Sequence, residues 1–188
     1  MGRVETIRRN HEENFSQTEK YIGITIPEHQ NRLICRYDRR FLQEKAPLFE
    51  QRVAEGFIRE CHGDLHLEHV VIGDDDVTIF DAIEFNERFR FGDVAAEVAF
   101  MAMDLEFNGY GAYADRFVKA YIRYSGDEKV QTLLNFYKCY YAYVRGKVVS
   151  FRLDDPDIAP ADREAAKEMA RRYFDLAYTC AARPERPV

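Results

Sequence analysis

Histidine and acidic side chains are concentrated in one short segment, residues 61–69, which reads CHGDLHLEH. Three of the five histidines of the chain, His62, His66 and His69, lie there, and Asp64 lies between the first two. A carboxylate such as that of Asp64 can accept a proton from a substrate hydroxyl as a general base. Histidines beside an aspartate can instead hold Zn2+ and activate water. The segment by itself therefore leaves both a general base and a zinc site open.

A second group of acidic residues lies at residues 80–86, in the sequence FDAIEFN. Asp81 and Glu84 of this group offer the hard oxygen ligands that Mg2+ prefers. Two short β-type runs separated by Gly-Asp-Asp-Asp precede it and predict a hairpin over residues 70–80. Because a hairpin brings the chain back beside its starting point, we expect Asp64, His69 and Asp81 to share one acidic site.

Helical patterns surround this segment on both sides. The first sixty residues carry apolar positions three and four apart, with Pro27 and Pro47 where helices begin and Gly56 where one ends. Asp93 is the expected N-cap of a buried helix that runs to about Asn108. Three more helices are expected near residues 113–124, 129–153 and 161–182. The second of these three has the longest apolar pattern and should be the most buried, and the hairpin is the only β structure that the sequence predicts.

The composition excludes several classes of protein. The 188 residues are 46% hydrophobic, which favours a folded core, and a net charge of -6 disfavours a general nucleic-acid binder. No apolar run approaches the roughly 20 residues of a membrane span, and the first residues do not resemble a secretory signal. The four cysteines lie far apart without a C-x-x-C pair, which predicts reduced thiols and a cytoplasmic location.

The motif His62-Gly63-Asp64-Leu65-His66, with Asp81 after a strand and then Gly92-Asp93, resembles the C-terminal lobe of aminoglycoside phosphotransferase-type kinases. The motifs cover residues 59–105, and the pattern is similar to a bacterial branch of this family in which some members carry a fused P-loop ATP-binding domain. The resemblance implies an α+β, mostly helical fold. It would be a kinase-like C-terminal lobe at residues 1–182, a helical bundle around one small hairpin. Residues 183–188 have the composition of a disordered tail or linker.

The resemblance also implies roles for individual residues. Asp64 would be the catalytic base that accepts the proton of the substrate hydroxyl, and Asp81 would bind the metal that bridges the nucleotide phosphates. Glu84 would either contact the metal itself or support the residues that hold it. Structural support of the loop is expected from His62, His66 and Asp93, with a phosphate contact as the alternative role of His66 and a helix cap as that of Asp93.

The chain departs from the family pattern at two points. Five residues after the base, where the family normally has Asn, this chain has His69. Imidazole suits Zn2+ or Mn2+ better than Mg2+, so we predict an altered metal ligand, with Mg2+ as the expected ion and Mn2+ as the alternative. The sequence also shows neither a glycine-rich nucleotide loop nor a G-x-x-x-x-G-K-[ST] motif. We therefore expect ATP to bind only where an N-lobe is supplied, and the chain to pair with that lobe or to self-associate.

Three functions remain open at this point. The first is the C-terminal lobe of a phosphotransferase that moves phosphate from ATP to a small-molecule hydroxyl and is incomplete or inactive alone. The second is a kinase-like binding or regulatory module without catalysis. A metal-dependent hydrolase is the third and is less favoured, because no histidine follows His69 to complete a zinc site. Fold analogy does not identify the phosphate acceptor. No nucleic-acid or membrane partner is expected.

Overall fold

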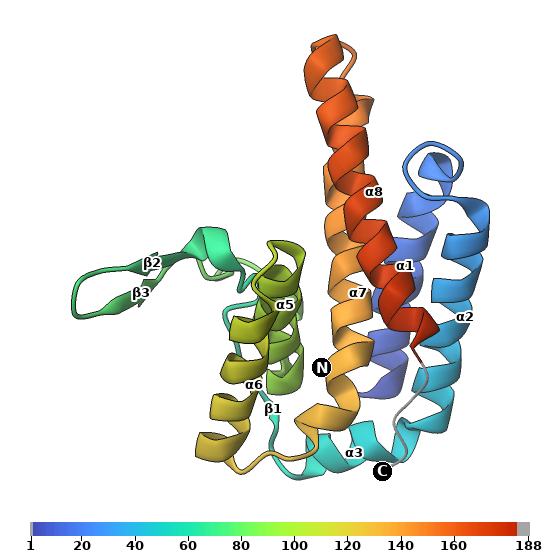
Figure 1. Cartoon of the computed structure of the whole chain (residues 1–188). Helices are drawn as coiled ribbons and strands as arrows, with labels where there is room; N and C mark the ends of the chain where they lie inside the picture. Colours follow the sequence, from blue (N-terminus) through green and yellow to red (C-terminus); the bar gives the residue numbers. More distant parts are fainter. Residues whose placement is uncertain (1, 184–188) are drawn as a thin grey trace.

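Helices form most of the computed structural model, which describes residues 2–183 (Figure 1). The long helices are α1 (Val4–Thr18), α2 (Glu28–Glu44), α3 (Ala46–Ala54), α5 (Val94–Phe107), α6 (Gly111–Ser125), α7 (Val130–Ser150) and α8 (Pro160–Ala182). The short elements are α4 (Glu87–Arg90) and the 3-10 turns η1 (Glu19–Tyr21), η2 (Leu67–His69) and η3 (Phe151–Asp154). Four strands of three residues each complete the chain: β1 (Ile58–Glu60), β2 (Val70–Ile72), β3 (Val77–Ile79) and β4 (Phe91–Asp93). The prediction of a mostly helical α+β fold is confirmed.

The predicted helix boundaries are close to the observed ones. The side chain of Asp93 accepts a hydrogen bond from the backbone N–H of Ala95 at 2.9 Å and so caps α5, which ends before Asn108 as expected. Pro27 is the N-cap of α2. Gly56, with φ +78°, follows the end of α3 in a conformation that L side chains rarely adopt. The tail predicted at 183–188 lies outside the described residues beyond Arg183.

The β structure is partly as predicted. Strands β2 and β3 form the expected antiparallel hairpin, in which Val70 pairs with Ile79. The prediction that this hairpin is the only β structure is wrong, because β1 and β4 also pair, with Ile58 opposite Asp93. These strands are too short for an alternating pattern to show, and they join segments far apart in the sequence. Their pairing is therefore a product of tertiary structure.

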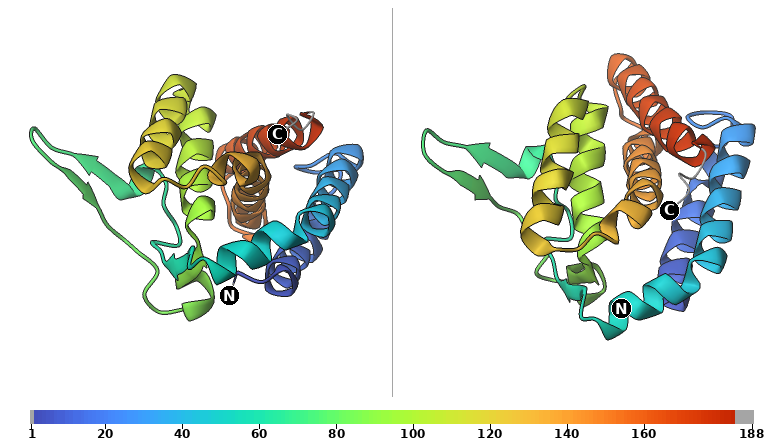
Figure 2. Two further views of the ribbon diagram at one scale, coloured as in Figure 1. Left: turned by 90° about the horizontal axis from the view of Figure 1, so that it is seen from below. Right: turned by 60° about the horizontal axis from the view of Figure 1, so that its bottom comes forward.

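Helix α7 lies at the centre of the molecule, with α8, α5 and the α1–α2 pair around it (Figures 1 and 2). Leu133, Phe136 and Tyr143 on α7 are all buried, as predicted for the helix with the longest apolar pattern. A Cβ on Gly146 would lie 2.9 Å from the Phe174 ring, so glycine lets α7 and α8 approach closely there. Helix α5 packs between α6 and α7, which explains why it is apolar on most of its surface.

A buried arginine ties the strand that leads into α5 to the rest of the fold. Arg52 on α3 is fully buried and forms bidentate ion pairs with Asp93 and with Asp127, at 2.7 to 2.8 Å. Its guanidinium also lies over the ring of Phe57, 4.3 Å from the centroid. Asp93 therefore both caps a helix and pairs with a buried cation, which fixes the start of α5 against α3.

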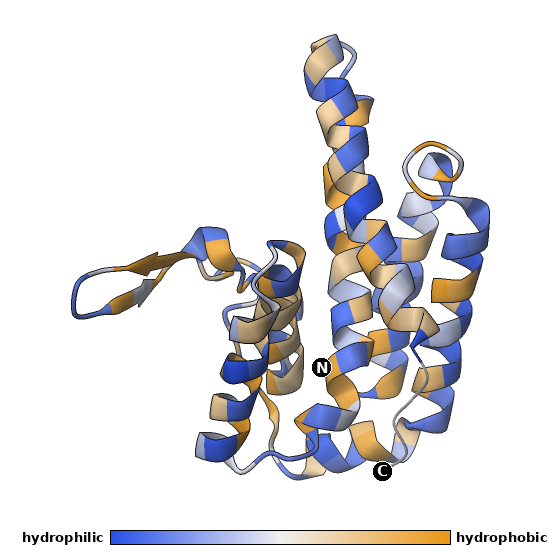
Figure 3. Ribbon diagram, viewed as in Figure 1, coloured by the Kyte–Doolittle hydropathy of each residue, from blue (hydrophilic) through white to orange (hydrophobic). Residues whose placement is uncertain are grey.

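The β2–β3 hairpin projects away from the helices (Figure 1), and its strands consist largely of hydrophobic residues (Figure 3). Val71, Ile72 and Val77 are exposed, Ile72 to 79%. None of the described helices combines the length and the apolar character needed to cross a bilayer.

Candidate active site

The segment 61–69 runs as a loop from β1 to the hairpin and is fixed at its start by a tight turn. The backbone N–H of Cys61 donates to the carbonyl of Arg90 at 2.7 Å. Gly63 follows with φ +83°, and a Cβ there would lie 2.8 Å from the backbone oxygen of Phe89. Both the dihedral angle and the close approach require glycine, which places Asp64 directly after a sharp change of chain direction.

Two acidic residues of α5 hold the backbone of this loop. Glu97 accepts a hydrogen bond from the N–H of Gly63, and Asp104 accepts one from the N–H of Leu67, both at 2.9 Å. Burial raises the pKa of Glu97, although the Gly63 amide acts in the opposite direction. Sequence reasoning did not assign these two residues to the site. The signal was available, because they are seven residues apart in a mostly apolar helix and so lie on one face.

His62 supports the loop through both ring nitrogens. Its Nε2 lies 2.7 Å from the carbonyl oxygen of Phe80, which can only accept, so Nε2 carries the proton. Its Nδ1 then accepts from the backbone N–H of Asp64 at 3.3 Å. The carbonyl of His62 in turn accepts from Ile83 at 2.8 Å. These bonds connect the loop to the chain that leaves the hairpin and leave His62 no free nitrogen.

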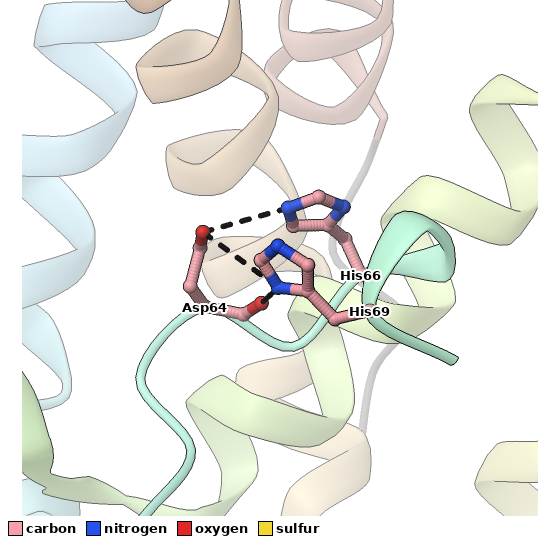
Figure 4. A group of neighbouring side chains, drawn as sticks. All are labelled: Asp64, His66 and His69. Atoms are coloured by element: carbon pink, nitrogen blue, oxygen red, sulfur yellow. Dashed lines mark hydrogen bonds and ion pairs between the residues drawn. The ribbon is translucent and has the colours of Figure 1, made fainter. Parts of the chain in front are cut away.

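Two imidazoles flank the carboxylate of Asp64 (Figure 4). Its Oδ2 lies 3.5 Å from Nε2 of His66 and 3.9 Å from Nδ1 of His69. The Asp64 side chain is 38% exposed, so a substrate can reach it, whereas the His66 side chain is only 3% exposed. Partial burial favours a raised pKa for Asp64, but His66, His69 and Arg145 outweigh it and lower the pKa. Asp64 is consequently ionised at neutral pH and able to accept a proton.

His69 connects Asp64 to Asp81. Its Nδ1 lies 2.9 Å from the carbonyl oxygen of Asp64 and therefore carries the proton in the neutral ring. Its Nε2 then presents a lone pair 3.4 Å from Oδ2 of Asp81. Two acceptors facing each other repel unless the ring is protonated or a cation binds both. Asp81 itself has φ +63°, rare for a residue with a side chain.

A model of the phosphotransferase enzyme family, the family of aminoglycoside phosphotransferases, matches residues 17–133, a span that contains this whole arrangement. The chain belongs to the phosphotransferase enzyme family. Uncharacterised proteins of Mycobacterium bovis and Mycobacterium tuberculosis are 32% identical to it over 161 residues, which is 85% of this chain and 32% of each relative. The chain thus spans about a third of the length of these curated relatives. No solved structure matches it.

The structure brings together most of the residues expected in a phosphotransferase site. Asp64 and Asp81 contact opposite nitrogens of the His69 imidazole, and the rings of His62 and His66 both lie beside that of His69. Glu84 is exposed and does not belong to the cluster around the base. Asp93 lies at the start of α5, paired with Arg52 and not with the loop.

The donor atoms at this site fit a divalent ion in two places. Nε2 of His69 and Oδ2 of Asp81 face each other with no proton between them in the neutral state, which suits an ion that accepts imidazole and carboxylate ligands, such as Mn2+. Asp64, His66 and His69 also present ligand atoms that all lie within 4.8 Å of one another. An ion held by this second set would use the carboxylate of Asp64 as a ligand.

Proposed function

We propose that the chain supplies the catalytic half of a phosphotransferase that moves the terminal phosphoryl group of ATP to the hydroxyl of a small molecule. The observation that carries the proposal is the environment of Asp64. Its carboxylate is exposed on one side, ionised at neutral pH, and flanked by imidazoles on a loop anchored to α5. This is the setting that a general base for a hydroxyl group requires.

In the proposed reaction the acceptor hydroxyl lies against the carboxylate of Asp64. The hydroxyl oxygen bonds to the γ-phosphorus, the bond from that phosphorus to the β–γ bridging oxygen breaks, and ADP leaves. The hydroxyl proton passes to Asp64. A divalent ion on Asp81 and His69 would neutralise charge on the phosphates. Phosphoryl transfer depends mainly on positioning and electrostatics, so the fixed loop matters as much as the base itself.

The nucleotide-binding lobe is proposed to come from another part of the protein or from another chain. This chain spans about a third of each relative, and its β2–β3 hairpin presents apolar side chains next to Asp81. Val71, Ile72 and Ile79 on the hairpin are all more than half exposed. An exposed apolar surface of this kind marks a site where a partner binds. We propose that the partner is the nucleotide-binding lobe, with self-association as the alternative in its absence.

The test of this proposal is a transfer assay on the chain together with its nucleotide-binding lobe. ATP labelled at the γ position is incubated with a panel of hydroxyl compounds and with Mg2+ or Mn2+. We expect label in an acceptor, and Mn2+ to support transfer at least as well as Mg2+ because His69 replaces an oxygen ligand. Failure to bind nucleotide, measured by calorimetry on the same sample, would favour a kinase-like binding module instead.

The cluster of Asp64, His66 and His69 favours a metal-dependent hydrolase as the second candidate. If zinc occupied this cluster, Asp64 would be a ligand and could not serve as the base. Metal analysis of protein purified without added metal separates the two functions. Zinc at one equivalent that is lost in His66→Ala would support the hydrolase, whereas zinc far below one equivalent supports the phosphotransferase.

A further inference from the structure

Two of the three buried side-chain atoms that have no hydrogen-bond partner in the described part of the chain converge on one place beside Asp64. They are Nδ1 of His66 and Nε of Arg145. Both belong to residues that lie 3.7 Å from the same oxygen, Oε2 of Glu68. This distance is too long for a hydrogen bond, and the Glu68 side chain is 76% exposed. Glu68 thus forms only long ion pairs with these two side chains, and no hydrogen bond satisfies either of the two buried nitrogens.

Arg145 is held in place by its surroundings. It comes from α7, its side chain is only 21% exposed, and its guanidinium lies over the ring of Tyr173 on α8, 5.7 Å from the centroid. Burial opposes its charged form, but Tyr173, Glu68 and Asp104 outweigh that effect and raise its pKa. Asp104 itself is committed to the backbone amide of Leu67. A planar guanidinium whose Nε–H has no partner is the side chain that best matches a carboxylate or phosphate.

The order of the side chains places Arg145 and Asp81 on different sides of the base. Asp64 contacts His69, whose far nitrogen faces Asp81. It also contacts His66, whose far nitrogen faces Glu68, and Arg145 lies against the same Glu68 oxygen. If a metal and the nucleotide phosphates lie at Asp81, the acceptor lies on the opposite side of the base.

We propose that Arg145, beside His66, forms a subsite that binds an anionic group, a carboxylate or phosphate, of the hydroxyl compound that receives the phosphoryl group. That the bound compound is the phosphoryl acceptor rests on the proposed function, whereas the binding of an anion does not. The exposed Glu68 side chain turns into solvent when the anion binds. A polycationic acceptor is correspondingly not expected. Asp154, an acidic residue that would attract one, is already paired with Lys20 at 2.6 Å and with Tyr21 at 2.7 Å.

The experiment follows the Nε–H resonance of Arg145 in 15N-labelled full chain. Sodium gluconate and inorganic phosphate are the anionic probes, D-glucitol is the neutral match of gluconate, and sodium chloride keeps the ionic strength constant. We expect both anions to shift this resonance in a saturable way and glucitol to leave it unchanged. Arg145→Gln should weaken gluconate binding, measured by calorimetry, by about tenfold or more, because charge-assisted hydrogen bonds are lost. Glu68→Gln should strengthen it, and the matched variant Arg152→Gln, in exposed η3, should not change it.

Three results would overturn the subsite. One is a resonance that neither anion moves, and another is gluconate affinity that is unchanged in both Arg145→Gln and Glu68→Gln. The third is competition, in which Mg·ATP displaces gluconate from Arg145, since the anion would then belong to the nucleotide. Because these measurements involve no phosphoryl transfer and the substitution removes a negative charge near the subsite, Asp64→Asn should not weaken gluconate binding. Anion binding without any transfer activity would therefore refute the proposed function and leave the subsite standing.

Discussion

Removal of the Arg52 guanidinium should be among the most destabilising single substitutions in this chain. Arg52 is fully buried, and the side chains of its partners Asp93 and Asp127 are 2% and 1% exposed. Arg52→Met keeps much of the side-chain volume but removes four N–H···O contacts of 2.7 to 2.8 Å. Two carboxylates would then be buried without a counter-charge. Loss of one partner from a buried pair costs about 3–5 kcal/mol, a large part of the roughly 5–15 kcal/mol that stabilises a domain.

Urea unfolding followed by circular dichroism measures this loss. The matched control is Arg32→Met, because Arg32 pairs with Glu28 on the exposed surface of α2, where a change within about 0.5 kcal/mol is expected. The double variant Arg52→Met with Asp127→Asn should be more stable than Arg52→Met alone, since one of the two unpaired charges is gone. A loss below about 1 kcal/mol for Arg52→Met, or a double variant that is less stable still, would refute the reasoning.

Three further predictions concern the loop, its anchor and the thiols. In urea unfolding, Gly63→Ala should cost more than Gly109→Ala, for which left-handed strain alone predicts about 1–2 kcal/mol. The reason is that, of these two glycines, only Gly63 also lies close to a backbone oxygen, and equal losses would contradict this. Since burial raises the pKa of Glu97, the folded chain holds that proton more tightly, and the contribution of Glu97 to stability should fall as pH rises above 4.5. In Glu97→Gln the free energy of unfolding should therefore fall less between pH 4.5 and pH 7 than in the wild type. An unchanged dependence of that free energy on pH would contradict this. Burial raises the pKa of every thiol, to about 12 at two of them, so iodoacetamide at pH 8 should label the native chain slowly and the urea-unfolded chain quickly, as mass spectrometry would show. Rapid labelling of Cys35, Cys61, Cys139 or Cys180 in the native chain would contradict this prediction.

Local signals in the sequence were enough to predict the helices and the hairpin. The caps and turns involve residues close together in the chain, such as Asp93 with Ala95, or Gly73 with Asp76 across the hairpin turn. The pairing of β1 with β4 was missed because strands of three residues carry no periodicity and their partners are distant. The same limit applies to Arg52, whose role depends on two aspartates at separations of 41 and 75 residues.

The candidate site was predicted in part for the same reason. His62, Asp64, His66 and His69 lie within eight residues, so their proximity follows from the sequence. The tautomers of His62 and His69 do not, because they depend on which carbonyl oxygen each ring meets. Arg145 lies about eighty residues further along the chain, on a helix whose pattern predicted only core packing. Its proximity to Glu68 emerges only when α7 packs beside α5.

The most direct test of the account is the rate of phosphoryl transfer in Asp64→Asn, measured on the chain with its nucleotide-binding lobe. Asparagine keeps the shape of the side chain but cannot accept the hydroxyl proton. The account predicts a fall of about 10²–10⁴-fold in turnover with unchanged affinity for Mg·ATP. Asp75→Asn, in the exposed hairpin turn, is the matched control and should keep the wild-type rate. Turnover of Asp64→Asn within a few-fold of the wild type would contradict the central claim that Asp64 is the base.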